Sequence, residues 1–152
     1  RAGLTRLGLD GRIAEVIDAD TVLPAPGQGA LAVEAREDDE RVRALLQAID
    51  HAPTRLATCA ERALLARVEG GCQAPVGALG TWSGDVLSLA AVVGSADGRR
   101  LLRAESRTLI QSDADAARAG ADLADRLLRD GASSILEEIR GRGASAAGTD
   151  AT

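Results

Sequence analysis

A cysteine next to two glycines is the residue best suited to chemistry in this sequence. Cys72 lies in the segment EGGCQAP at 69–75. Two glycines permit positive φ angles and leave space around the next side chain, so the thiol can project from the turn and be alkylated. The alternative interpretation is a helix end followed by a small buried cysteine. The second cysteine, Cys59, lies within a predicted helix near its apolar stripe, which indicates packing.

The helix expected before this turn influences the reactivity of the thiol. Cys72 follows the C-terminal end of that helix, where the helix dipole disfavours a thiolate. Arg62 and Arg67 lie upstream on the same helix and can offset this effect. A thiol in such a place suits one slow attachment event better than rapid turnover.

The composition excludes several classes of function. A net charge of -5 argues against neutralisation of phosphates, so no nucleic acid partner is expected. No stretch approaches the roughly 20 apolar residues that span a bilayer, so no membrane partner is expected. Two cysteines and one histidine give neither a disulfide framework nor a metal-ligand spacing. A globular protein of the reducing cytoplasm fits best.

The first fifty residues predict pieces of structure rather than a domain. Residues 1–9 indicate the end of a helix, and the prolines and glycines at 23–29 exclude helix there. The apolar run at 30–35 predicts a strand. Asp38 or Asp39 is expected to cap a helix with apolar residues at helical spacing, namely Val42, Leu45, Leu46 and Ile49.

Residues 51–143 predict an α+β domain. A helix over 54–69 precedes three strand patterns, which are expected to form an antiparallel meander covered on one face by helices. The strand patterns lie at 76–82, 86–93 and 101–109, and an Asp-Gly pair at 97–98 indicates a hairpin between the last two.

Two further helices are predicted after the strands. Asp113 is expected to cap the first, and Gly131 to end it. Ser134 and Glu137 have the spacing of a capping box, which predicts the start of the second helix. Residues 144–152 are small and polar, which predicts a disordered tail.

Three separated motifs resemble those of the porphobilinogen deaminases, or hydroxymethylbilane synthases. They are GLTRLG at 3–8, LPAPGQGAL at 23–31, and ERA at 61–63 followed by GGCQAPVG at 70–77. The motifs follow the order and distances of that family, and the similarity covers about residues 2–139. The resemblance implies that the chain is the C-terminal part of such an enzyme.

The resemblance also implies a division into domains. Residues 1–23 would end the second domain, and residues 24–50 would return to the first as a strand and a helix. Both domains would be incomplete here and would resemble periplasmic binding proteins. Residues 51–143 would be the C-terminal domain that carries the cofactor. The full-length enzyme would be a monomer, with the missing N-terminal domains as partners of this chain.

A covalent dipyrromethane cofactor follows from the same resemblance. Cys72 would hold it through a thioether, with Gly71 beside the attachment point. Arg62 would bind a carboxylate of the cofactor nearby. Attachment would need the cleft between all domains, so the isolated chain can lack the cofactor.

The substrate site implied by the resemblance draws on the first two motifs. Arg6 would bind carboxylates of cofactor or substrate, because each pyrrole carries acetate and propionate groups. Gln28 and Gly29 would lie in a turn whose amides face the cleft. The substrate would be porphobilinogen, four units of which are deaminated and joined into hydroxymethylbilane in tetrapyrrole and haem biosynthesis.

The family's catalytic aspartate belongs to segments that precede the matched motifs. No catalytic residue is therefore expected on this chain, and the chain alone is expected to be inactive. Two other functions remain open: a non-enzymatic binding or regulatory module, and a redox protein that uses the Cys72 thiol. Apolar residues within 24–50 can also drive self-association.

Overall fold

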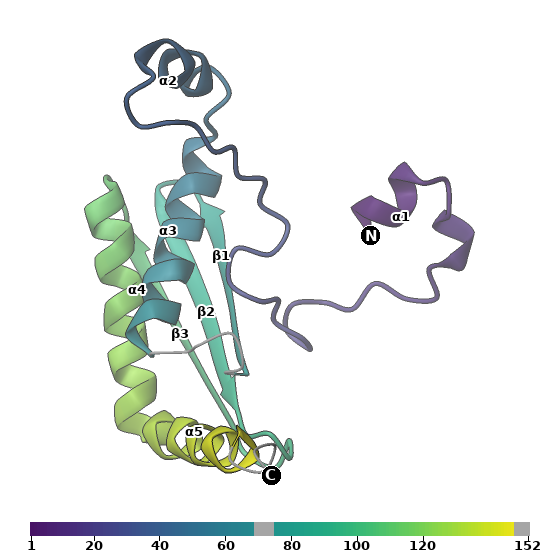
Figure 1. Cartoon of the computed structure of the whole chain (residues 1–152), viewed down its shortest axis with the longest axis vertical. Helices are drawn as coiled ribbons and strands as arrows, with labels where there is room; N and C mark the ends of the chain where they lie inside the picture. Colours follow the sequence, from purple (N-terminus) through teal and green to yellow (C-terminus); the bar gives the residue numbers. More distant parts are fainter. Residues whose placement is uncertain (69–74, 148–152) are drawn as a thin grey trace.

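The computed structural model of the chain describes residues 1–68 and 75–147, with the backbone alone for 142–147. The C-terminal half forms one sheet with helices packed on it, and the N-terminal half winds beside this unit (Figure 1). The helical elements in chain order are α1 (Ala2–Arg6), η1 (Asp10–Arg12), α2 (Glu40–Gln47), α3 (Ala52–Arg67), α4 (Asp113–Leu127), η2 (Leu128–Ala132) and α5 (Ser133–Ala147).

The sheet has three antiparallel strands in the order β1-β2-β3. They are β1 (Val76–Ser83), β2 (Val86–Gly94) and β3 (Leu101–Leu109). Two residues join β1 to β2, and the Asp-Gly pair lies in the turn between β2 and β3. Ala78 pairs with Ala91, which pairs with Ala104, so small side chains cross the middle of the sheet. The predicted α+β meander is confirmed.

α3 and α4 cover one face of the sheet, as expected (Figure 1). Alternate residues of β2 point towards these helices and are buried, namely Leu87, Leu89, Ala91 and Val93. The two helices approach closely, because a Cβ on Gly120 of α4 would lie 2.0 Å from the carbonyl oxygen of Ala60 in α3. The chain has almost no aromatic residues, so its core consists of aliphatic side chains. Many of these are alanines, which allow the helices to pack closely.

Two predicted helix caps are wrong. Ser112, and not Asp113, caps α4, since its Oγ accepts a hydrogen bond from the backbone N–H of Asp115 at 3.1 Å. Ser134 forms no capping box, because its hydroxyl donates to the carbonyl of Gly131 at 3.0 Å and α5 has already begun at Ser133. Gly131 has φ 114° and interrupts the helical path before α5, as predicted.

The expected strand at 30–35 is absent. Leu31 is 98% exposed and Val33 is 62% exposed, and no described strand pairs with this segment. A strand needs a neighbour for its N–H and C=O groups, so an apolar run alone does not form one. The predicted cap of α2 is confirmed in Asp39, whose Oδ1 accepts from Val42 N at 3.0 Å.

At the C-terminus, α5 extends to Ala147, so residues 144–147 are helical rather than part of the expected tail. Residues 148–152 lie outside the described part of the chain. Among the described helices, none combines the length and apolar character needed to cross a membrane.

Candidate cofactor and substrate site

The proline- and glycine-rich segment lies along the outer edge of β1 as two consecutive turns. Pro24 O accepts a hydrogen bond from Ala78 N of β1 at 2.9 Å. In the first turn, Gln28 N donates to Ala25 O at 2.9 Å. In the second turn, Ala30 N donates to Gly27 O at 3.2 Å. Pro26 followed by Gly27, with φ 75°, gives the first turn the residues of a type II turn.

A buried carboxylate holds this loop in place. Glu61 of α3 is 4% exposed. Its Oε2 accepts from Gly27 N at 2.6 Å, and its Oε1 accepts from Gly80 N of β1 at 2.7 Å. One side chain therefore connects a helix, a strand and the loop that carries Gln28.

Sequence reasoning missed the role of Glu61, although it lies in the ERA motif. The buried residues of α3 include Ala57, Ala60, Glu61 and Leu64, which follow the i, i+3, i+4, i+7 spacing of one helix face. A glutamate on an apolar face is the signal that could have identified it, because buried carboxylates need hydrogen-bond partners.

A cavity of about 270 Å³ lies between the loop, α3 and β1. Gln28 and Gly29 line it from the loop, and Trp82 from β1. The indole of Trp82 donates to Pro53 O at 2.8 Å, which fixes that wall against the start of α3. The predicted substrate residues Gln28 and Gly29 therefore border a hollow beside α3.

Arg62 follows Glu61 in α3 but is exposed. It takes part in none of the ion pairs formed among the described residues, and the same holds for Arg6 of α1. Among the described residues, both guanidinium groups are thus open to an external carboxylate, and their roles in binding cofactor or substrate stay predictions. α1 lies apart from the sheet and its helices, so the structure does not bring Arg6 together with Arg62 (Figure 1).

Cys72 and Gly71 lie outside the described residues. The described chain flanking them consists of Val68, which is 1% exposed at the end of α3, and Pro75, which is exposed before β1. The predicted display of the thiol therefore stays a prediction.

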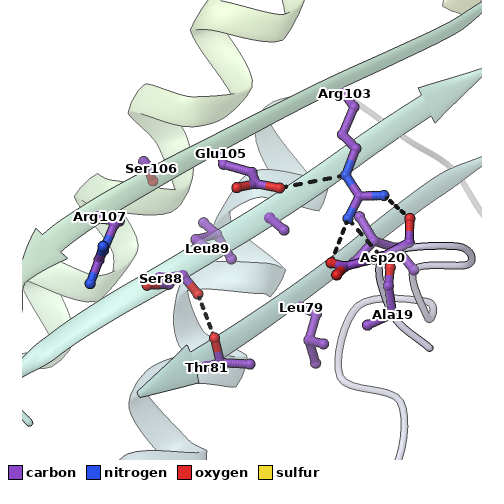
Figure 2. Close-up of a pocket in the computed structure, with 12 residues that line it drawn as sticks. Ala19, Asp20, Leu79, Thr81, Ser88, Leu89, Arg103, Glu105, Ser106 and Arg107 are labelled. Carbon is purple, nitrogen blue, oxygen red and sulfur yellow. Dashed lines mark hydrogen bonds and ion pairs between the residues drawn. The ribbon is translucent and has the colours of Figure 1, made fainter. Parts of the chain in front are cut away.

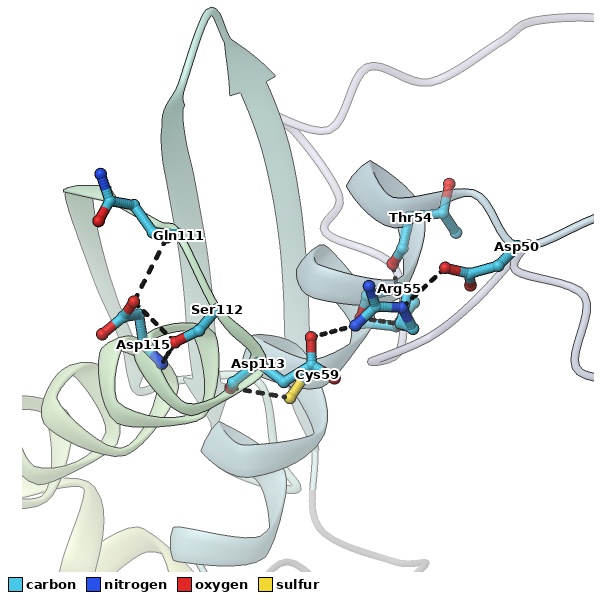
Figure 3. A network of polar contacts seen from close by, with 9 residues as sticks. Asp50, Thr54, Arg55, Cys59, Gln111, Ser112, Asp113 and Asp115 are labelled. Atoms are coloured by element: carbon cyan, nitrogen blue, oxygen red, sulfur yellow. Dashed lines mark hydrogen bonds and ion pairs between the residues drawn. The ribbon is translucent and has the colours of Figure 1, made fainter. Parts of the chain in front are cut away.

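Cys59 packs at the helix interface, as the sequence indicated. Its Sγ lies 3.5 Å from the carbonyl oxygen of Asp113 at the start of α4 (Figure 3). Beside it, Arg55 pairs with Asp50 and with the side chain of Asp113, which ties the N-terminal ends of α3 and α4 together. These contacts raise the pKa of Arg55, mainly through its hydrogen bond to Asp50.

A second cavity, of about 300 Å³, lies on the sheet face opposite the helices (Figure 2). Arg103 of β3 donates to Asp20 O at 2.6 Å and lies 3.6 Å from the Glu105 carboxylate. Its guanidinium is thus occupied in holding the segment around Asp20 on the sheet. Of the predicted site residues that the structure describes, none lines this cavity.

Comparisons with known proteins bear on both parts of the site. A family model described as "Porphobilinogen deaminase, dipyromethane cofactor binding domain" matches residues 1–44. A second, described as "Porphobilinogen deaminase, C-terminal domain", matches residues 55–129. The chain belongs to the porphobilinogen deaminase family. Arg6, Gln28 and Gly29 fall in the first match, and Arg62 falls in the second, so the candidate site of this porphobilinogen deaminase segment draws on both.

Curated relatives named porphobilinogen deaminase share close similarity with this chain. Those of Chlorobium chlorochromatii and Desulforudis audaxviator are 46% and 52% identical over 140 residues, and that of Trichlorobacter lovleyi is 47% identical over 138. Each alignment covers 91% of this chain but only 43–45% of the relative. The chain thus spans less than half the length of these porphobilinogen deaminases.

Proposed function

We propose that this chain forms the C-terminal part of an active porphobilinogen deaminase, which joins four porphobilinogen units into hydroxymethylbilane in haem biosynthesis. The observation that carries the proposal is the hydrogen bond from Gly27 N to the Glu61 carboxylate. It joins two family-like motifs, at 23–31 and 61–63, that are far apart in the sequence. The three relatives described above, which are 46–52% identical to this chain, are named porphobilinogen deaminase, and this supports the proposed activity.

In this proposal, Cys72 holds a dipyrromethane through a thioether bond, and Gly71 leaves space for it. When bound, this group supplies the pyrrole to which the substrate units are joined. Arg62 pairs its forked N–H groups with a cofactor carboxylate, for which its exposure and lack of ion pairs among the described residues suit it. Tethering replaces repeated encounters with intramolecular ones, which lowers the entropic part of the barrier.

Substrate binding is assigned to the N-terminal motifs. Gln28 and Gly29 border the cavity beside α3, where the amide side chain of Gln28 and the backbone N–H of Gly29 can bind a substrate carboxylate. Arg6 binds a further carboxylate from α1. Residues 1–23 and 24–50 complete the second and first domains of the longer protein, which acts in the cytoplasm, and residues 51–143 form the C-terminal domain to which the cofactor is attached.

Intact mass of the longer protein that contains this chain tests the proposal. The wild type is expected to exceed its polypeptide mass by that of two linked pyrroles, and Cys72→Ala to show the bare polypeptide mass. Cys59→Ala is the matched control, because Cys59 packs against α4, and it should retain the added mass. Retention of the added mass in Cys72→Ala would refute the attachment.

The same measurement separates the two other functions. A binding or regulatory module would show the bare polypeptide mass in every variant. A redox protein would show mixed disulfides that a reductant removes, whereas a thioether resists reduction.

The chain by itself is proposed to be inactive. Consumption of porphobilinogen by the 152-residue chain should equal that of a blank without protein, while the longer protein should consume it. Turnover by the isolated chain would show that the catalytic groups lie within these residues.

A further inference from the structure

Glu61 is the one charged side chain that is buried within the described part of the chain. None of the ion pairs among the described residues includes it, so no cation in that part of the chain compensates its charge. Two backbone N–H groups take that role, at 2.6 Å from Gly27 and 2.7 Å from Gly80. Charge-assisted hydrogen bonds of this length are among the stronger ones in proteins.

This arrangement is a poor way to gain stability alone. Burial of a carboxylate is costly, and apolar residues often replace buried ionic groups without loss of stability. The neighbouring buried positions of α3 are Ala57, Ala60 and Leu64, which shows that apolar packing is the rule on this face. The carboxylate instead fixes the relative positions of the loop and β1, because it accepts one backbone N–H from each.

The elements that it connects are those that border the cavity. Gly27 lies in the turn directly before Gln28 and Gly29, which line the cavity together with Glu61 itself. Gly80 lies in the middle of β1, and Glu61 is adjacent to the exposed Arg62. The loop is therefore held in a fixed position relative to the helix that presents Arg62.

We propose that Glu61 is a positioning residue, which holds the 25–30 loop against α3 and β1 so that Gln28 and Gly29 meet the substrate in a fixed geometry. This inference rests on the proposed function for its effect on substrate, but not for its effect on the loop. Glu61 is no proton donor to substrate, because both of its oxygens already accept backbone N–H bonds.

The first experiment measures amide hydrogen exchange in the 152-residue chain and requires no activity. Glu61→Gln keeps the shape but replaces one acceptor oxygen by an NH₂ donor, so one of the two bonds is lost. We expect exchange at Gly27 or Gly80, and at Gln28 and Ala30, to become about tenfold faster or more. Core amides, such as that of Ala91, should change by less than about threefold.

Glu137→Gln is the matched control, since Glu137 is exposed on α5 and lies outside the proposed site. It should leave the loop amides unchanged. A uniform acceleration of all amides in Glu61→Gln would assign Glu61 a purely structural role and overturn the inference. Unchanged loop amides would overturn it as well.

The second experiment uses the longer protein. Glu61→Gln should raise KM for porphobilinogen about tenfold, with kcat within about threefold and with the same added mass on the polypeptide, because uniform binding is lost. A fall in kcat at unchanged KM would contradict positioning of the substrate loop. If the wild type consumes no porphobilinogen, the proposed function fails, while the exchange result still decides whether Glu61 holds the loop.

Discussion

Two adjacent residues of α3, Glu61 and Arg62, carry opposite charges and face opposite environments. The glutamate is buried and bonded to two backbone N–H groups, whereas the arginine is exposed and pairs with no described carboxylate. Glu61 thus holds the neighbouring loop and strand against α3, while Arg62 presents a cation that pairs with none of the described residues. A stability measurement and a binding measurement should separate these two roles.

Arg62→Ala is expected to leave the free energy of unfolding of the chain within about 0.5 kcal/mol of the wild-type value, since an exposed side chain with no ion pair to a described residue contributes little. In the longer protein, the same change should raise KM or lower cofactor loading about tenfold, because one charged hydrogen bond is lost. Arg62→Lys should give KM and cofactor loading between those of the wild type and of Arg62→Ala, because lysine keeps the charge but lacks the forked N–H groups. Arg41→Ala, in exposed α2, is the control, and an equal effect from it would contradict a specific role for Arg62.

At the scale of elements, the close contact between α3 and α4 depends on Gly120, which has no side chain at the point where the helices meet. Gly120→Ala would place a Cβ 2.0 Å from the carbonyl oxygen of Ala60, so the helices must separate. We expect a loss of about 3 kcal/mol or more in chemical denaturation. Gly141→Ala in α5 meets no atom within 4 Å and should be neutral or stabilising. Equal stability of the two variants would refute the close approach.

The start of α4 should make stability depend on pH. The hydrogen bond from Ser112 and, next, the one from Arg118 hold the pKa of Asp115 below its usual value. The folded state therefore binds this proton less readily than the unfolded state, so the stabilisation is present at neutral pH and is lost as pH falls through the folded pKa.

Asp115→Asn should accordingly flatten the loss of Tm between neutral pH and about pH 3, and should lower Tm at neutral pH. Asp122→Asn, an exposed position on the same helix, should keep the wild-type slope. A wild-type slope in Asp115→Asn would show that this carboxylate is not coupled to folding.

At the scale of the whole molecule, the N-terminal half leaves apolar side chains uncovered. Leu31 is 98% exposed, and Val33, Leu45 and Ile49 are each more than half exposed. Such a surface favours association in water, and in the longer relatives further chain is available to cover it.

The 152-residue chain should therefore show a mass by light scattering that increases with concentration. Replacement of Leu31 and Val33 by serine should lower that mass, because less apolar surface is left to bury. Leu109→Ser removes an exposed leucine from β3 instead and is the control. A constant monomer mass for the wild type would contradict the prediction.

The elements of the C-terminal half could be predicted from local sequence patterns. The three strands, their hairpin turns and the helices around them follow from periodicity and turn residues that act over a few positions, and the three motifs indicated the family. Local signals also misplaced two caps. Ser112 and Asp113 are both good capping residues, and only one of them can cap α4. Ser134 lies within α5, which begins at Ser133.

The contact between the motifs depends on how the helices, strands and loops pack, which the sequence patterns do not report. The absence of a strand at 30–35 depends on the lack of a pairing partner among the described residues, which an apolar pattern does not report. Glu61 and Gly27 are 34 residues apart, so no local rule connects them. A buried carboxylate takes its partners from whatever backbone N–H groups the packed elements present, and that is a property of the fold rather than of the neighbouring sequence.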